Sequence, residues 1–327
     1  MASNRNLRGS KHFTLQPLTD GVYACLHKPG GAAYSNAGII ELGDHTLLVD
    51  SFDSLAAGRD LRQTAESLLE RPVGTIVLTH AHGDHWKGAS VFDAETLLLA
   101  SKTVRQVCLD RGPLMVEDMK DAAAWEKRLG ETELQLRTEQ DDRVRVGLER
   151  AVMRIGYAMA EMGEFRPRYA DRTFEDTVLF QGSKRNAELR SLGCGHSEDD
   201  AVLFLPHDGV AFIGDIGFFD TQPFLGFCDI ELYRRQLLFL QESDFKVLVP
   251  GHGPVGDKND IALQLRYMDV LEDLVGTVAA GGGSLEEARQ IMLPDPFDKW
   301  LMGGMARFDD NVRFFFARLG GEMRPDV

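Results

Sequence analysis

Three histidines and an aspartate fall within six positions of the chain, as His80, His82, Asp84 and His85. Imidazoles and a carboxylate are ligands that suit zinc, manganese or iron, and no cysteine lies among them to indicate a sulfur-rich structural site. Because the chain has only nine histidines, this clustering favours metal ligands over ordinary surface or core residues. The pattern therefore predicts a metal site.

A short strand is expected to deliver these ligands. Residues 74–79 are rich in β-branched side chains and have the length of a buried strand that ends where the histidines begin. On the following loop, residues two apart can face the same way, so His80 and His82 could hold one ion. The turn that follows carries Asp84 and His85 toward a second ion, and we therefore expect a site for two metals.

Three more segments could complete the site. His196 lies between small residues shortly before a strand predicted at 201–205, and His252 follows an apolar strand within a Gly/Pro loop. Asp215 is the last residue of a strand predicted over 210–215. Taken singly, each of the three has an alternative role as a loop, turn or cap residue.

In their order along the chain, these motifs resemble the signature of the metallo-β-lactamase-fold hydrolases: His-x-His-x-Asp-His, then Gly-His-[Ser/Thr], Gly-Asp and Gly-His. The match extends over roughly residues 22–254. The resemblance implies an α/β fold, a four-layer αβ/βα sandwich. It assigns His80, His82 and His196 to a first metal and Asp84, His85 and His252 to a second, with Asp215 bridging both.

The resemblance also implies a metal-dependent hydrolase. Two divalent ions, zinc first with manganese or iron as alternatives, would activate a bridging hydroxide that attacks an ester, thioester, lactone or amide carbonyl of a small molecule. Asp84 would relay a proton to the leaving group. True β-lactamases of one subgroup have a cysteine ligand in the place of Asp215, so the aspartate points to the broader hydrolase group.

An iron-dependent oxidoreductase of the same fold is the alternative. Persulfide dioxygenases use a single iron with fewer ligands, and the full set of seven disfavours them. Flavodiiron-like proteins need an electron donor, and the sequence gives no sign of a flavin domain. A binding protein with a vestigial site would predict broken ligands, and none of the seven is broken.

Three residues close to the motifs, Asp50, Trp86 and Lys87, allow further predictions about the site. Asp50 ends an apolar strand predicted over 45–50, which pairs with one at 35–40, and in similar proteins this aspartate supports the metal loop. Its alternative is a turn or cap residue. Trp86 and Lys87 stand where relatives often carry smaller residues, and Lys87 either receives an anionic group or is an exposed surface lysine.

At 327 residues and 43% hydrophobic, the whole chain is expected to form one elaborated domain. Residues 101–164 are predicted to be a helical insertion and residues 257–327 a helical C-terminal extension. The insertion could serve as a lid, a homodimer contact or simple packing. Phe218, Phe219 and Phe224, after the bridging aspartate, either wall an apolar substrate pocket or belong to the core.

The net charge of −15 and the lack of a basic run argue against nucleic acid as a partner. No stretch approaches the length of a membrane span, and no apolar region follows the first residues as in a signal peptide. Four cysteines without close spacing favour free thiols. We expect Cys194, two residues before His196, to be buried in a tight loop, and the alternative is that it faces the site. These features predict a cytoplasmic enzyme acting on a small molecule, without a membrane partner.

Overall fold

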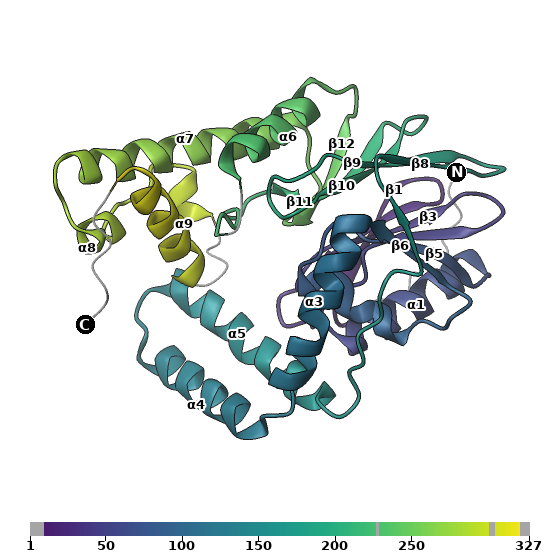
Figure 1. The fold of residues 1–327 in the computed structure, drawn as a ribbon, viewed down its shortest axis with the longest axis horizontal. Coiled ribbons are helices and arrows are strands. Elements are labelled where there is room, and N and C mark those ends of the chain that lie inside the picture. The colour runs from purple at the N-terminus through teal and green to yellow at the C-terminus, as the bar shows by residue number, and fades with distance from the viewer. Residues whose placement is uncertain (1–9, 227–228, 301–304, 321–327) are drawn as a thin grey trace.

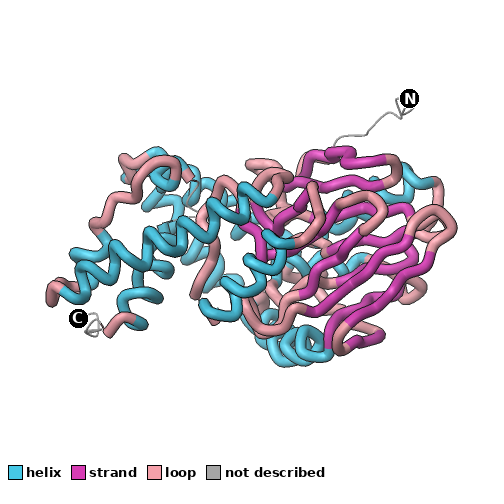
Figure 2. The backbone as a smooth tube through the Cα atoms, turned by 90° about the horizontal axis from the view of Figure 1, so that it is seen from above, coloured by secondary structure: helices cyan, strands magenta, loops and turns pink. Residues whose placement is uncertain are grey.

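Two β-sheets pack face to face, and helices cover their outer sides (Figures 1 and 2). The structure is a computed structural model, and it describes residues 10–226, 229–300 and 305–320. The layers confirm the predicted αβ/βα sandwich.

The first sheet contains seven strands that lie side by side in chain order. Its first four strands are antiparallel, and the last three continue in parallel. Residues 41 and 46 face each other across the predicted hairpin between β3 and β4. The strands are β1 Phe13–Thr19, β2 Val22–His27, β3 Ala37–Glu41, β4 Thr46–Val49, β5 Val73–Val77, β6 Leu97–Ser101 and β7 Arg172–Phe174.

The second sheet has the order β12-β11-β10-β9-β8. Its strands are β8 Thr177–Gln181, β9 Asn186–Ser191, β10 Ala201–Leu205, β11 Val210–Phe218 and β12 Val247–His252. The predicted end of a strand at Asp215 is wrong, since β11 continues to Phe218. The reason is a bulge at Gly214, where φ is +52° and the register with β12 shifts before pairing resumes.

Apolar side chains hold the layers together. Ile40 and Leu47 of the first sheet pack with Leu203 and Phe212 of the second, and all four are buried. Helix α1, Leu55–Leu69, covers the outer face of the first sheet. Helices α6, Ile230–Glu242, and α7, Lys258–Ala280, cover the second.

Three helices occupy the predicted insertion: α3 Lys102–Asp118, α4 Ala122–Thr138 and α5 Asp142–Glu161. The hairpin of α4 and α5 extends away from the sheets (Figure 1), and α4 has no buried residue. The end of α5 returns to the core, because the Glu161 carboxylate accepts hydrogen bonds from the first two backbone amides of α1 at 2.9 Å each.

The C-terminal region is helical over its described residues. Helix α7 has Gly281 as its C-cap, and Ser284 caps the start of α8, Leu285–Arg289, in a capping box with Glu287. The short helix η2, Phe297–Lys299, and α9, Met305–Arg318, follow. Phe315 and Phe316 are fully buried and belong to the core that packs against the second sheet. None of the described helices is both long and apolar enough to cross a bilayer.

Candidate metal centre

All seven side chains that the motifs single out meet at one edge of the sandwich. The loop after β5 carries His80 and His82, and the short helix α2, Gly83–Trp86, carries Asp84 and His85. The remaining three come from the second sheet and its loops: His196 lies between β9 and β10, Asp215 within β11, and His252 at the end of β12. Residues more than a hundred positions apart thereby form one cluster.

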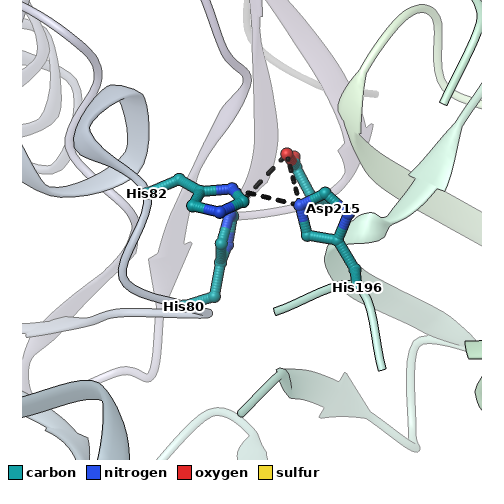
Figure 3. A group of neighbouring side chains, drawn as sticks. All are labelled: His80, His82, His196 and Asp215. Atoms are coloured by element: carbon teal, nitrogen blue, oxygen red, sulfur yellow. Dashed lines mark hydrogen bonds and ion pairs between the residues drawn. The ribbon is translucent and has the colours of Figure 1, made fainter. Parts of the chain in front are cut away.

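The first group consists of His80, His82, His196 and Asp215 (Figure 3). One candidate ligand atom from each lies within 4.8 Å of the others. Oδ2 of Asp215 is 3.3 Å from Nε2 of His196 and 3.6 Å from Nε2 of His80. This arrangement of three imidazoles and a carboxylate could hold a divalent ion.

The second group consists of Asp84, His85 and His252. Oδ2 of Asp84 lies 3.8 Å from Nε2 of His85 and 3.3 Å from Nε2 of His252. The other oxygen of Asp215, Oδ1, lies 3.0 Å and 3.4 Å from the same two nitrogens. Asp215 therefore presents one oxygen to each group, which is what a carboxylate shared by two ions requires.

The environment of these side chains fits metal ions. Nε2 of His80 is buried and has no hydrogen-bond partner in the described part of the chain, an arrangement that is costly unless a cation accepts its lone pair. Burial, together with the charge of His85, holds the pKa of His80 well below its usual value. Burial and His196 lower the pKa of His82 to about 3. Both imidazoles are thus neutral, the form that binds metal.

The carboxylates at the site are ionised. Burial raises the pKa of Asp215, but the neighbouring imidazoles of His252 and His85 outweigh it and hold that pKa well below the usual value. The pKa of Asp84 is held low in the same way, by its hydrogen bond to His252 and by His85 against the effect of burial. Burial lowers the pKa values of His85 and His252, but the neighbouring carboxylates outweigh it and raise both, so these two imidazoles give up a proton when a cation binds.

Asp50 supports the metal loop directly. Its Oδ1 accepts a hydrogen bond from the Thr79 backbone amide, and its Oδ2 accepts one from the Thr79 hydroxyl, each at 2.8 Å. The same Oδ2 lies 2.8 Å from Nδ1 of His85. The carboxylate therefore fixes the end of β5 and the ring of His85 together, which is the supporting role that the resemblance implied.

Other residues that position the site had no signal in the sequence. Nδ2 of Asn36 donates to the backbone oxygens of Pro250 and Gly253 at 2.9 Å each and so holds the loop of His252. Oδ2 of Asp200 accepts from the backbone amide of His196 at 2.8 Å. Asn36 lies more than 200 positions from its partners, so no local motif could reveal it.

A cavity of about 310 Å³ opens beside His252. Helices α3 and α5 and the loop after β2 form much of its wall. Phe219 lines the cavity. Phe218 instead stacks on the ring of His252 with centroids 5.1 Å apart, and Phe224 lies near His196 at 6.4 Å. Of the three phenylalanines, only Phe219 thus belongs to the described wall.

The structure also resolves the alternatives for the residues beside the motif. Nζ of Lys87 lies 2.6 Å from Oδ1 of Asp53, so this lysine is an ion-paired residue at the cavity rather than an exposed one. Trp86 is buried, and its indole donates a hydrogen bond to the backbone oxygen of Arg168.

Cys194 is exposed, so the prediction that it is buried is wrong. It lies on a turn where Gly193 has a φ of +75°, and the backbone amide of Asp200 donates to the Gly193 carbonyl. This turn keeps His196 inside and leaves the neighbouring thiol at the surface. Cys25 and Cys108 are buried free thiols, whereas Phe227 and Cys228 lie outside the described residues.

The comparisons with known proteins agree with this arrangement. A family model described as the metallo-beta-lactamase superfamily matches residues 30–252. A search of curated proteins gives no match.

Solved structures of several metallo-beta-lactamases resemble the chain in fold. A metallo-beta-lactamase from Pontibacter korlensis is 18% identical with a TM-score of 0.56, over 78% of this chain and 98% of that one. The metallo-beta-lactamase FIM-1 from Pseudomonas aeruginosa, in its mono-zinc form, is 18% identical with a TM-score of 0.52, over 78% and 94%. A metallo beta lactamase from Hirschia baltica is 16% identical with a TM-score of 0.54, over 79% and 97%. At these identities, the likeness is one of fold.

Proposed function

The chain belongs to the metallo-beta-lactamase superfamily, and on that premise we propose that it is a dinuclear metal-dependent hydrolase. The superfamily also has members that are not hydrolases, so the proposal depends on the site. The observation that carries it is Asp215, whose two oxygens face the two imidazole groups separately. The substrate in this proposal is a small molecule with an ester, thioester, lactone or amide bond.

In this proposal, the seven side chains of the cluster hold two ions. His80, His82 and His196 hold one ion, and Asp84, His85 and His252 hold the other, with Asp215 shared. Divalent ions, zinc first, would supply a water of lowered pKa as nucleophile and would polarise the carbonyl oxygen of the substrate.

Asp84 is the proposed proton relay. Its carboxylate lies 3.3 Å from Nε2 of His252, and Gly83, the residue before it, lines the cavity where a substrate would enter. A carboxylate at this position can accept a proton from the attacking group and pass it to the leaving group. The backbone oxygen of Asp84 accepts a hydrogen bond from the Ser35 hydroxyl at 2.5 Å, which limits the movement of the segment that carries Asp84.

Elemental analysis of the purified protein tests the metal part of the proposal. We expect close to two ions per chain, and a value near zero after expression in metal-supplemented medium would contradict it. Iron with a visible absorption band would support the oxidoreductase alternative.

Replacing ligands tests the catalytic part. We expect the double variant His80→Ala, His82→Ala to lose the metal and hydrolysis of a panel of model esters, thioesters, lactones and amides together. His207→Ala, which removes an exposed histidine outside the cluster, is the matched control and should change neither. Hydrolysis retained by the double variant would remove these residues from the mechanism.

A further inference from the structure

Two arginines from the helical additions line the cavity beside the metal centre. Arg150 lies on α5 and Arg307 on α9, and both contribute to the same wall. Neither forms an ion pair with a carboxylate among the residues that the structure describes. Nε of Arg150 is buried and lacks a hydrogen-bond partner there, while Arg307 donates to the backbone oxygen of Gln222 at 3.1 Å.

Most other charges in this wall are already compensated. Asp53 accepts from Arg154 at 2.7 and 3.1 Å and also pairs with Lys87. Asp118 pairs with Arg128 at 2.8 Å, and Glu161 accepts from the backbone of α1.

Two charged groups of the wall remain besides the two arginines. Lys28 donates to the Ser10 backbone oxygen at 2.7 Å, and Asp220 is exposed. The two arginines therefore leave an excess of positive charge at the cavity of a chain whose net charge is −15.

The two guanidinium groups act on each other. Burial lowers the pKa of Arg150, and the charge of Arg307 lowers it further, against the opposing effect of Tyr34. Two like charges that line one cavity without a counter-ion repel each other, and a bound anion would remove this penalty.

Arg307 is one aromatic ring away from His252, and both arginines line the same cavity as His252. The guanidinium of Arg307 lies 5.3 Å from the ring centroid of Phe218, which stacks on His252. Arg150 acts electrostatically on His27, whose ring is 6.4 Å from that of His252. An anion between the arginines would therefore lie close to the metal ligands.

The rest of the wall is suited to an apolar molecule. Met115, Met153 and Phe165 line the cavity together with Phe219. Methionine side chains adapt to apolar ligands of different shape, because they are unbranched and polarisable. A substrate could thus place an apolar body among these side chains while its charged end stays near His252.

We propose that Arg150 and Arg307 bind an oxyanion of the substrate, a carboxylate or a phosphate, and that the substrate is an apolar molecule carrying this group near its scissile bond. The assignment of a scissile bond rests on the proposed function, whereas binding of the anion does not. Guanidinium groups bind both oxyanions through paired hydrogen bonds, and two of them facing one cavity suit a single anion.

Calorimetric titration of the zinc-loaded protein with octanoate, octyl phosphate and the neutral octanamide tests the binding. We expect Arg150→Gln and Arg307→Gln each to weaken binding of the preferred anion by about tenfold to a hundredfold, with octanamide unchanged. Arg145→Gln, on the same helix but outside the cavity wall, is the control and should behave as the wild type. The tighter of the two anions identifies the oxyanion.

An anion held only by the metals would bind equally well to the wild type and to both glutamine variants, and that result would overturn the inference. Circular dichroism checks that the variants are folded. Arg150→Lys adds a second check, since it keeps the charge without the planar fork and should weaken binding less than Arg150→Gln.

A pair of esters separates this inference from the proposed function. The p-nitrophenyl monoester of suberate carries a free carboxylate, and p-nitrophenyl octanoate is its neutral counterpart. Arginine-dependent binding without cleavage of either ester would support the inference and contradict the hydrolase. If both esters are cleaved at equal rates and their binding does not depend on the arginines, the result supports the hydrolase and overturns the inference.

Discussion

The strands that carry the metal cluster and the helical insertion differ in how tightly they are packed. Every residue of β11 is buried, and β5 and β12 each have only one residue that is not, whereas α4 in the insertion has no buried residue at all. In the strands, several glycines are packed so closely against neighbouring segments that an added Cβ would clash. In the insertion, several positions have open space around them.

This difference separates two tasks. The cluster needs seven side chains held at fixed distances, which close-packed strands provide because they cannot relax. The hairpin of α4 and α5 contributes cavity wall and is attached to the core by contacts such as Arg154 to Asp53 and Glu161 to the start of α1. Changes in the strands should therefore damage the metal site, and changes in the insertion should alter stability or selectivity alone.

Gly251→Ala should have the largest effect, although it removes no ligand. A Cβ at this position would lie 1.9 Å from Oδ1 of Asp215 and 2.9 Å from the Asp215 backbone nitrogen, so the shared carboxylate would have to move. We expect activity to fall by about a hundredfold, with a matching loss of metal measured by elemental analysis.

Gly74→Ala is the control for this change, because the added Cβ in β5 would meet its nearest atoms at an ordinary 3.5 Å. If Gly251→Ala kept both metals and full activity, the strands would be less rigid than their close packing indicates.

Asp50→Asn should have the next largest effect on the metal site. Asn tolerates the left-handed backbone that Asp50 adopts, with φ at +59°, so the change removes the charge and one acceptor without straining the chain. We expect metal affinity to fall about tenfold to a hundredfold, measured by competition with a chelator. Asp44→Asn, in the exposed turn before β4, should leave metal affinity unchanged, and a loss of equal size there would point to a general charge effect.

The sequence predicted the metal-bearing strands better than the insertion for a physical reason. Ligands for one ion must have particular chemical types, so His80, His82, Asp84 and His85 are recognisable from the printed sequence. Short apolar runs also predicted β3, β4 and β10 close to their observed ends. The bulge that places Asp215 within β11 depends on pairing with β12, a contact that no local pattern contains.

The two arginines of the cavity, in contrast, could not be predicted from the sequence. Arg150 and Arg307 lie 157 positions apart, and each has the surroundings expected of an ordinary surface arginine in its own helix. Their shared wall exists only because α5 and α9 meet the same loop region, so a sequence offers nothing to connect them. Lys87 was ambiguous for the same reason, since Asp53 becomes its partner only after folding.

Asp53→Asn should have a moderate effect, at the junction between core and insertion. The Asp53 carboxylate is buried, and it binds Arg154 and Lys87. Because Arg154 is partly exposed, we expect a loss of about 1–3 kcal/mol in the free energy of unfolding at neutral pH, measured with urea. Metal content should stay unchanged.

The effect of Asp53 should also depend on pH. Burial raises its pKa, but Arg154 and Lys87 outweigh burial and lower it below the ordinary value of about 4. A depressed folded-state pKa stabilises the protein above the ordinary value, and that contribution is lost as pH falls below it. The stabilities of wild type and Asp53→Asn should therefore converge below pH of about 4. A difference that persisted in acid would mean that the ion pairs are not the cause.

Gly130→Ala should have the smallest effect, and it should be stabilising. Gly130 lies inside α4, and a Cβ built there meets no atom within 4 Å, so the substitution gains helix propensity of about 0.5–1 kcal/mol without a clash. Gly58→Ala is the matched control in α1, where the Cβ would lie 2.6 Å from the backbone oxygen of Gly88 and should destabilise the protein. Hydrogen exchange of each helix measures both effects. If Gly130→Ala proved destabilising, the face of α4 would have to be covered in solution, and a second copy of the chain would be the first partner to test by ultracentrifugation.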